Sequence, residues 1–229
     1  MSIDVRRAGD RMATRTSWLD SRHSFSYGSH YDPANTHFGL LLCSNEDVLD
    51  PGAGFDEHPH RDVEVVTWVL SGVLAHADSA GHRGEVRPGF LQWMSAGRGV
   101  RHAERSVGTD PAHYVQMWVR PGEPGGEPGY EMRDLTGDLP AGGLVPVRSA
   151  AAPDATLHVA RLPPGGTGTL PNAPYVHVFV AGGALDLAGA GMLRPGDAAR
   201  LTAAGQVRLS APGGAEVLAW EMRTGLPVG

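Results

Sequence analysis

The chain has 229 residues, of which 41% are hydrophobic and 19% charged, and it carries a net charge of −6. This composition is typical of a soluble globular protein, and the acidic balance argues against direct binding to nucleic acid. Charged residues are scattered through the first twenty positions, and no apolar run reaches the length of a membrane span. We therefore expect a cytoplasmic protein with no signal peptide and no membrane contact.

Apolar runs of strand length recur along the whole chain, separated by turns rich in its 32 glycines and 18 prolines. In chain order the runs are HFGLLLCS, EVVTWVLSG, GFLQWMSA, AHYVQMWVR, LHVARL, YVHVFVAGG, AARLTA, QVRLSA and AEVLAWEM. They are rich in valine, leucine and aromatic residues, and no long segment shows the 3.6-residue period of a helix. The pattern predicts an all-β protein built as sandwiches or barrels, with little helix.

The first of these runs contains Cys43, which is the single cysteine of the chain. One cysteine excludes an internal disulfide framework and any CxxC metal site. Because it lies in the apolar segment GLLLCS, we expect a small buried thiol.

The clearest interruption of the strand pattern is RPGEPGGEPG, from Arg120 to Gly129, with four glycines and three prolines in ten residues. It either links two domains or forms a long loop before a linking segment that runs to about Gly143. A similar order of strands and turns lies on both sides: EVVTWVLSG…RPGFLQW before it and YVHVFVAGG…RPGDAARL after it. This weak duplication predicts two barrels of related design, residues 1–143 and 144–229.

Histidines break the symmetry between the two halves, because only His158 and His177 of the eleven follow the interruption. A metal centre would therefore belong to the first half. His177 stands in an apolar strand without a neighbouring ligand and is predicted to be a satisfied core or surface histidine. His76 and His82 flank the turn ADSAGHRG and are predicted to be solvated.

Two histidine-containing segments in the first half could hold a metal ion. In FDEHPHRDVE, His58 and His60 point to the same face of a strand, and Glu64 can share that face. In WMSAGRGVRHAER, His102 and Glu104 are again two residues apart. Imidazole with carboxylate suits iron, manganese, nickel, copper or zinc better than calcium or magnesium. The spacing alone leaves open whether Glu64 or Glu104 completes the site.

The strand HYVQMWV alternates Tyr114, Gln116 and Trp118 against Val115, Met117 and Val119. One of these two sets must fill the interior of a barrel. The sequence does not decide which set touches a ligand.

These segments resemble the motifs of the pirin family. GFDEHPHRDVE, followed by a strand end at Gly72, resembles the first cupin motif, and PGFLQWMSAGRGVRHAE (Pro88 to Glu104) resembles the second in its pirin form. WLDSRHSFSY and the later YDP at Tyr31 to Pro33 are similar to the opening of bacterial pirin-like proteins. The resemblance covers nearly all of the first half. The second half resembles the pirin C-terminal cupin only in layout, because its metal motifs are absent.

The resemblance implies a monomeric bicupin, with two double-stranded β-helix barrels in tandem and one divalent metal ion in the N-terminal barrel. The implied ligands are His58, His60, His102 and Glu104. Glu64 then lies beside the ligands without binding the ion. We expect the bound ion to be Fe²⁺, and the same ligand set would also accept nickel, copper, manganese or zinc.

The resemblance also implies an activity, since bacterial pirin-like proteins are similar to quercetin 2,3-dioxygenases. These enzymes open the central ring of a flavonol with O₂ and release carbon monoxide, and Glu104 would act as the general base. A second hypothesis follows from the likeness to animal pirins, which look like iron-dependent modules that regulate transcription through a protein partner: this chain would be a metal-dependent, redox-sensing module that binds such a partner. An isomerase or hydrolase acting on another small molecule is a third, because cupin barrels host many chemistries.

Overall fold

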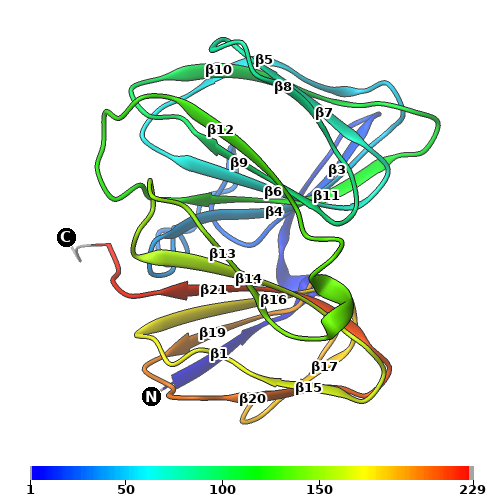
Figure 1. The fold of residues 1–229 in the computed structure, drawn as a ribbon, viewed down its shortest axis with the longest axis vertical. Coiled ribbons are helices and arrows are strands. Elements are labelled where there is room, and N and C mark those ends of the chain that lie inside the picture. The colour runs from blue at the N-terminus through cyan, green and yellow to red at the C-terminus, as the bar shows by residue number, and fades with distance from the viewer. Residues whose placement is uncertain (1, 227–229) are drawn as a thin grey trace. The chain divides into compact units, whose positions relative to one another are not determined.

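The computed structural model describes residues 2–226, and nearly all of its regular structure is β-strand (Figure 1). The helical segments among these residues are two single 3₁₀ turns, η1 (Ala8–Asp10) and η2 (Leu139–Ala141). None of the described helices is long and apolar enough to cross a membrane. The all-β fold class with two cupin barrels is confirmed.

The first compact unit consists of Met12–Thr36 and Leu41–Thr136 and contains two antiparallel sheets. Its seven-stranded sheet has the order β12-β9-β6-β11-β4-β3-β2, and its four-stranded sheet has the order β5-β10-β7-β8. The strands of the larger sheet are β2 (Met12–Arg15), β3 (Leu19–His23), β4 (Leu41–Leu49), β6 (Glu64–Ser71), β9 (Phe90–Ser95), β11 (Ala112–Val119) and β12 (Gly129–Asp134). Those of the smaller sheet are β5 (Gly54–His60), β7 (Leu74–Asp78), β8 (Arg83–Val86) and β10 (Val100–Ser106).

The second unit comprises the residues up to Arg11, His37–Leu40 and the residues from Gly137 onward. Its sheets have the orders β1-β19-β16-β21-β14-β13 and β15-β20-β17-β18. The strands of the larger sheet are β1 (Ser2–Arg6), β13 (Val145–Arg148), β14 (Ala155–Leu162), β16 (Tyr175–Gly183), β19 (Ala198–Thr202) and β21 (Ala215–Met222). Those of the smaller sheet are β15 (Gly166–Thr169), β17 (Leu185–Leu187), β18 (Gly191–Leu193) and β20 (Arg208–Ala211).

The two units share one strand plan, as the duplicated sequence pattern predicts. The order β9-β6-β11-β4 in the first unit corresponds to β19-β16-β21-β14 in the second, and β5-β10-β7-β8 corresponds to β15-β20-β17-β18. The two segments EVVTWVLSG and YVHVFVAGG form β6 and β16, which pair with β9 and β19 respectively. Equivalent positions of the two units can therefore be compared strand by strand.

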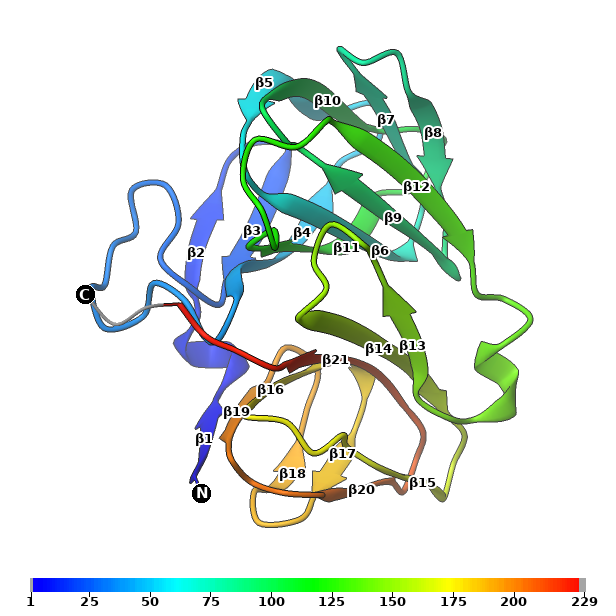
Figure 2. The same ribbon diagram turned by 60° about the vertical axis from the view of Figure 1, so that its left-hand side comes forward.

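The proline- and glycine-rich segment is a loop inside the first unit. It joins β11 to β12, and β12 pairs with β9 over six residues, Gly129–Asp134 against Phe90–Ser95. The N-terminal strand β1 belongs instead to the second unit, where Ser2–Arg6 pair with Ala198–Thr202 of β19 (Figures 1 and 2). A division into independently folding domains at residue 143 stays a prediction.

The interior of the first unit is set by the alternation of side chains along its strands. In β10 the residues Val100, His102, Glu104 and Ser106 are buried, whereas Arg101 and Arg105 are exposed. The apolar interior is closed by Leu49, Val69, Leu74, Val86 and other buried residues. Cys43 is a buried free thiol, as predicted, and His177 is buried in the second unit. The interior face of β10 is therefore largely polar, since His102, Glu104 and Ser106 are all buried on it.

Candidate metal centre

Strand β10 brings the predicted ligands together because it lies between β5 and β7. His102 pairs across the sheet with His58 of β5 on one side and with Asp78 of β7 on the other. Side chains of directly opposed residues lie within contact distance on the same face. Two residues further along β10, Glu104 lies opposite His76 of β7. Antiparallel register thus converts two short sequence motifs into one cluster.

A bulge in β5 adjusts the orientation of His58. From His102 to Glu104, β10 advances two residues, while β5 moves from His58 to Phe55, so β5 contains an extra residue here. The backbone oxygen of Asp56 lies 2.8 Å from Nδ1 of His58 and accepts its hydrogen bond. The hydrogen on Nδ1 leaves the lone pair of His58 on Nε2, which is the arrangement that metal-binding histidines adopt.

His58, His60 and His102 form a compact group of imidazoles. Their ring centroids are 4.4 Å apart for His58 and His102, 4.8 Å for His60 and His102, and 5.0 Å for His58 and His60. One ring nitrogen from each lies within 4.8 Å of the others. The Nε2 atoms of His60 and His102 are buried and have no hydrogen-bond partner among the described residues. Buried, unpaired nitrogens that converge in this way fit a metal ion that accepts their lone pairs.

The electrostatics of the cluster also suit metal binding. Burial, reinforced by the neighbouring His58, lowers the pKa of His60 to about 4. Burial and the surrounding histidines lower the pKa of His102 to about 2. Both rings are therefore neutral at physiological pH, and only a neutral imidazole can offer a lone pair to a metal ion.

Glu104 is a buried carboxylic acid beside this group. Its Oε1 accepts a hydrogen bond of 2.8 Å from Nε2 of Gln116 in β11. Burial raises the pKa of Glu104 to about 7, although the hydrogen bond from Gln116 opposes the shift. The ligand atoms of Glu104, His76 and His102 also lie within 4.8 Å of one another, so His102 belongs to both groups of potential ligands in the described residues.

Glu64, the other candidate carboxylate, is fixed to the neighbouring strand β9. It is buried, and its Oε2 accepts hydrogen bonds from Nε1 of Trp93 at 2.8 Å and from Oγ of Ser95 at 2.5 Å. Burial raises its pKa in spite of these two bonds. The predicted place of Glu64 beside the metal ligands stays a prediction.

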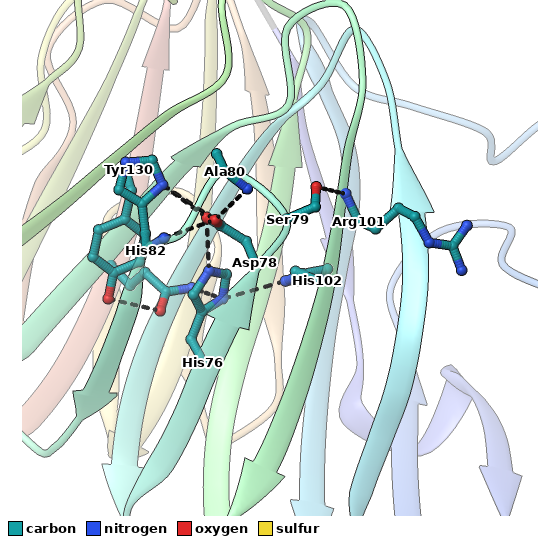
Figure 3. Close-up of polar contacts among 9 residues, drawn as sticks. His76, Asp78, Ser79, Ala80, His82, Arg101, His102 and Tyr130 are labelled. Atoms are coloured by element: carbon teal, nitrogen blue, oxygen red, sulfur yellow. Dashed lines mark hydrogen bonds and ion pairs between the residues drawn. The ribbon is translucent and has the colours of Figure 1, made fainter.

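The prediction that His76 is solvated is wrong, because its side chain is completely buried in β7. His82, whose side chain is 37% exposed, does reach solvent. Leu74, His76 and Asp78 alternate along LAHAD and share the interior face, a signal that the sequence contains and that the adjacent turn obscured. Figure 3 shows His76 between His102 and Asp78.

The alternation in β11 is resolved in favour of Gln116 and Trp118 as the residues nearest the cluster. The Trp118 ring meets the His60 ring edge-on with centroids 5.0 Å apart, and Tyr27 meets Trp118 in the same way at 5.5 Å. Nε1 of Trp118 donates to Oε1 of Gln116 at 3.2 Å. His60 also lines a hollow of about 400 Å³ together with exposed residues that include Pro59 and Arg101. Trp118 therefore flanks the imidazole cluster at His60, and Tyr27 packs against Trp118; these two rings form an aromatic wall.

Comparison with known proteins identifies the family. The model of the family described as Pirin matches residues 5–119. A Mycobacterium tuberculosis protein named "Putative quercetin 2,3-dioxygenase" is 50% identical over 236 residues, covering 98% of this chain and 97% of that protein. The chain belongs to the pirin family.

Two further pirin relatives come from Escherichia coli. One, named "Quercetin 2,3-dioxygenase", is 43% identical over 132 residues, which is 57% of each chain. The other is the crystal structure of the bacterial pirin YhhW in complex with nickel(II), which is 30% identical. It superposes with a TM-score of 0.89 and covers 97% of this chain and all of that one.

The second barrel of this pirin replaces the polar cluster with apolar residues. Where Glu104 of β10 faces His76 of β7 in the first unit, Leu209 of β20 faces Leu187 of β17 in the second. Both leucines are buried in the apolar core of that unit. Neither group of potential metal ligands among the described residues lies there.

Proposed function

We propose that this pirin is a metal-dependent dioxygenase that opens the central ring of a flavonol with O₂ and releases carbon monoxide. The observation that carries the proposal is the convergence of His58, His60 and His102 with buried, unpaired Nε2 atoms at two of the three. The names of the mycobacterial and E. coli relatives support the choice of reaction.

The proposed metal ligands are His58, His60, His102 and Glu104, with one divalent ion per chain. We propose Fe²⁺ as the native ion, and the nickel complex of the E. coli pirin supports a site that also accepts nickel. The bound ion would act as a Lewis acid on the 3-hydroxyl oxygen of the flavonol and on the reaction with O₂.

Glu104 is the residue best placed to move a proton. Burial raises the pKa of Glu104 in the metal-free chain to about 7, so a carboxyl group released from the ion could take the hydroxyl proton of a bound flavonol and return it. Gln116 orients this carboxyl group, because Trp118 holds the amide oxygen and so directs the amide nitrogen toward Glu104. The acid–base function of Glu104 thus depends on a fixed partner in another strand.

The aromatic wall would bind the flat substrate. Trp118 lies next to His60 and Tyr27 lies next to Trp118, and apolar aromatic surfaces hold planar ligands while excluding water. Exclusion of water favours reaction of the deprotonated flavonol with O₂ over its reprotonation by solvent.

The test is a turnover assay with defined metal. Protein stripped by a chelator is reloaded anaerobically with Fe²⁺, Ni²⁺, Mn²⁺, Cu²⁺ or Zn²⁺ in separate samples, mixed with quercetin and then exposed to air. Loss of flavonol absorbance with stoichiometric carbon monoxide is expected for at least one ion. His113→Ala removes a histidine that pairs with Glu46 outside the cluster and should retain turnover, whereas His58→Ala should not. Tight metal binding with no quercetin consumed for any ion would contradict the proposed reaction.

The alternative of a regulatory module that binds a protein partner would use the same cluster, and it stays a prediction. A cytoplasmic location and a monomeric state also stay predictions.

A further inference from the structure

Behind His102, on the side away from His58, three side chains form a line of hydrogen bonds. Nδ1 of His102 lies 3.3 Å from Nδ1 of His76, and Nε2 of His76 lies 3.3 Å from Oδ2 of Asp78 (Figure 3). All three side chains are buried. Because His102 is also one of the three clustered imidazoles, this line connects the cluster to a carboxylate two rings away.

Asp78 is held in place by the turn that follows β7. Its Oδ1 accepts hydrogen bonds from the backbone nitrogens of Ala80 at 2.9 Å and His82 at 3.0 Å. Nδ1 of His82 lies 3.0 Å from Oδ2. Although burial opposes it, hydrogen bonds from His82 and His76 keep the pKa of Asp78 below its usual value. The group that faces His76 is therefore an ionised carboxylate, which can only accept a hydrogen bond.

This fixed acceptor determines the hydrogen positions along the line. Nε2 of His76 must carry a hydrogen, because two lone pairs would otherwise face each other across 3.3 Å. A neutral His76 then has its lone pair on Nδ1, so Nδ1 of His102 must be the donor in the bond between the two rings. Nε2 of Gln92, 3.5 Å from Nδ1 of His76, is also a donor and agrees with this assignment. His102 is left with its lone pair on Nε2, the buried atom that has no hydrogen-bond partner.

We propose that His76 and Asp78 are positioning residues that dictate which nitrogen of His102 can bind the metal ion. The inference rests on the proposed metal centre and adds two residues that do not touch the ion. It also assigns His76, whose two nitrogens are both engaged, to the support of His102 rather than to metal ligation. In metal sites of known proteins, a partner on the far nitrogen of a histidine ligand fixes its tautomer and raises its affinity.

The second barrel agrees with this assignment. The position equivalent to His76 is Leu187, and its partner across the sheet is Leu209 instead of Glu104. The second barrel therefore has a leucine in place of the proposed ligand Glu104 and also a leucine in place of the supporting residue His76.

Asp78→Asn is the sharpest test because it leaves the turn intact and exchanges donor and acceptor in the hydrogen bonds that join residue 78, His76 and His102. The amide oxygen can still accept from Ala80 and His82, while the amide nitrogen replaces Oδ2 and becomes a donor toward His76. The hydrogen of His76 is then driven to Nδ1, and that of His102 to Nε2, where it blocks metal binding. We expect the affinity for Ni²⁺ or Fe²⁺, measured by competition with a chelator, to fall about 10- to 100-fold. His82→Gln, which removes a contact of Asp78 outside the line, should change the affinity less than about threefold.

The tautomer itself can be read in the metal-free protein by ¹⁵N NMR of the histidine side chains. In the unmodified chain, Nδ1 of His102 should show the shift of a protonated nitrogen and Nε2 that of an unprotonated one. Asp78→Asn should exchange the two shifts. Because this measurement needs neither metal nor substrate, failure of the dioxygenase assay would leave it unaffected. Protonated Nε2 on His102 in the unmodified chain would overturn the inference.

A double-mutant cycle distinguishes an effect transmitted through the line of hydrogen bonds from a general disturbance of β7. His76→Phe retains a ring beside Tyr130 and removes the acceptor for His102, so it should also weaken metal binding about tenfold or more. Since Asp78 acts only through His76, adding Asp78→Asn to His76→Phe should weaken metal binding no further. Additive losses in the double variant would show that the two residues act independently, contrary to the proposal.

Discussion

The side-chain amide of Gln116 donates a 2.8 Å hydrogen bond to Glu104 across the interior of the first barrel. Gln116 lies on β11 of the seven-stranded sheet and Glu104 on β10 of the four-stranded sheet. The bond therefore links the two sheets of the unit at the point where the imidazole cluster lies. Through this bond an uncharged residue, Gln116, lowers the pKa of the buried carboxyl group of Glu104.

Replacing Gln116 by leucine should impair the acid–base function of Glu104. The carboxylate would lose its donor in a buried position, so the pKa of Glu104 should rise further above its ordinary value. We expect the acidic limb of the pH–rate profile, along which protonation of Glu104 lowers activity, to shift to higher pH, and metal affinity to fall about tenfold. The measurements are a pH–rate profile with the metal-loaded protein and a chelator competition. His113→Ala, also on β11, is the matched control. An unchanged pH profile would show that Gln116 does not act on Glu104.

Glu104→Gln should stabilise the metal-free protein at neutral and alkaline pH. In the folded chain, burial raises the pKa of Glu104 to about 7 from an ordinary value of 4.5. The folded state therefore binds the proton more tightly than the unfolded state, and stability falls as pH rises between these two values. The free energy of unfolding should be about 3 kcal/mol higher for the variant than for the unmodified chain at pH 8.

The same comparison at pH 4.5 should show a difference of only about 0.4 kcal/mol, because Glu104 is then protonated in the folded state and half protonated in the unfolded state. Buried histidines such as His60 have the opposite effect, because the free energy of unfolding falls as pH drops below their ordinary pKa. Both proteins contain these histidines, so their contribution cancels in the comparison. Urea titrations of chelator-treated protein at the two pH values provide the measurement. Equal stabilities at pH 8 would mean that the carboxyl group is not penalised by burial.

His58→Ala should remove the metal without unfolding the barrel. Its ring is partly exposed at the edge of the cluster, so the apolar core does not depend on it. We expect metal affinity to fall at least about 100-fold, the upper end of the effect of losing a partner of a ligand. Elemental analysis reports the metal content, and the far-ultraviolet circular dichroism should remain that of a β-protein. An unfolded variant that retained its metal elsewhere would refute the ligand assignment.

A chain that begins at Ala8, without β1, should be less stable in its second unit. Ile3 and Val5 pack against the core of that unit, and the carboxylate of Asp197 would lose its 2.8 Å contact with Arg7. The lost burial should cost roughly 2–4 kcal/mol, and β19 would become an exposed edge prone to aggregation. Thermal unfolding and light scattering would record both effects. The metal affinity should not change, because all proposed ligands lie in the first unit.

The local pattern of the sequence predicted the strands and the pairing of residues on one face. Apolar runs bounded by glycine and proline became strands, and the two-residue spacing placed His58 beside His60 and His102 beside Glu104. These features depend only on the alternation of side chains along an extended chain, so they can be read without knowing which strands meet.

What the sequence could not supply is which strands lie next to each other and in which register. That β10 lies between β5 and β7 decides that His102 faces both His58 and Asp78, and it buries His76, which sequence alone placed in solvent. The pairing of β1 with β19, almost two hundred residues later in the chain, was equally unreadable. The pairing and register of strands depend on which faces become buried in the complete core. That burial involves segments far apart in the chain, so no short segment determines it alone.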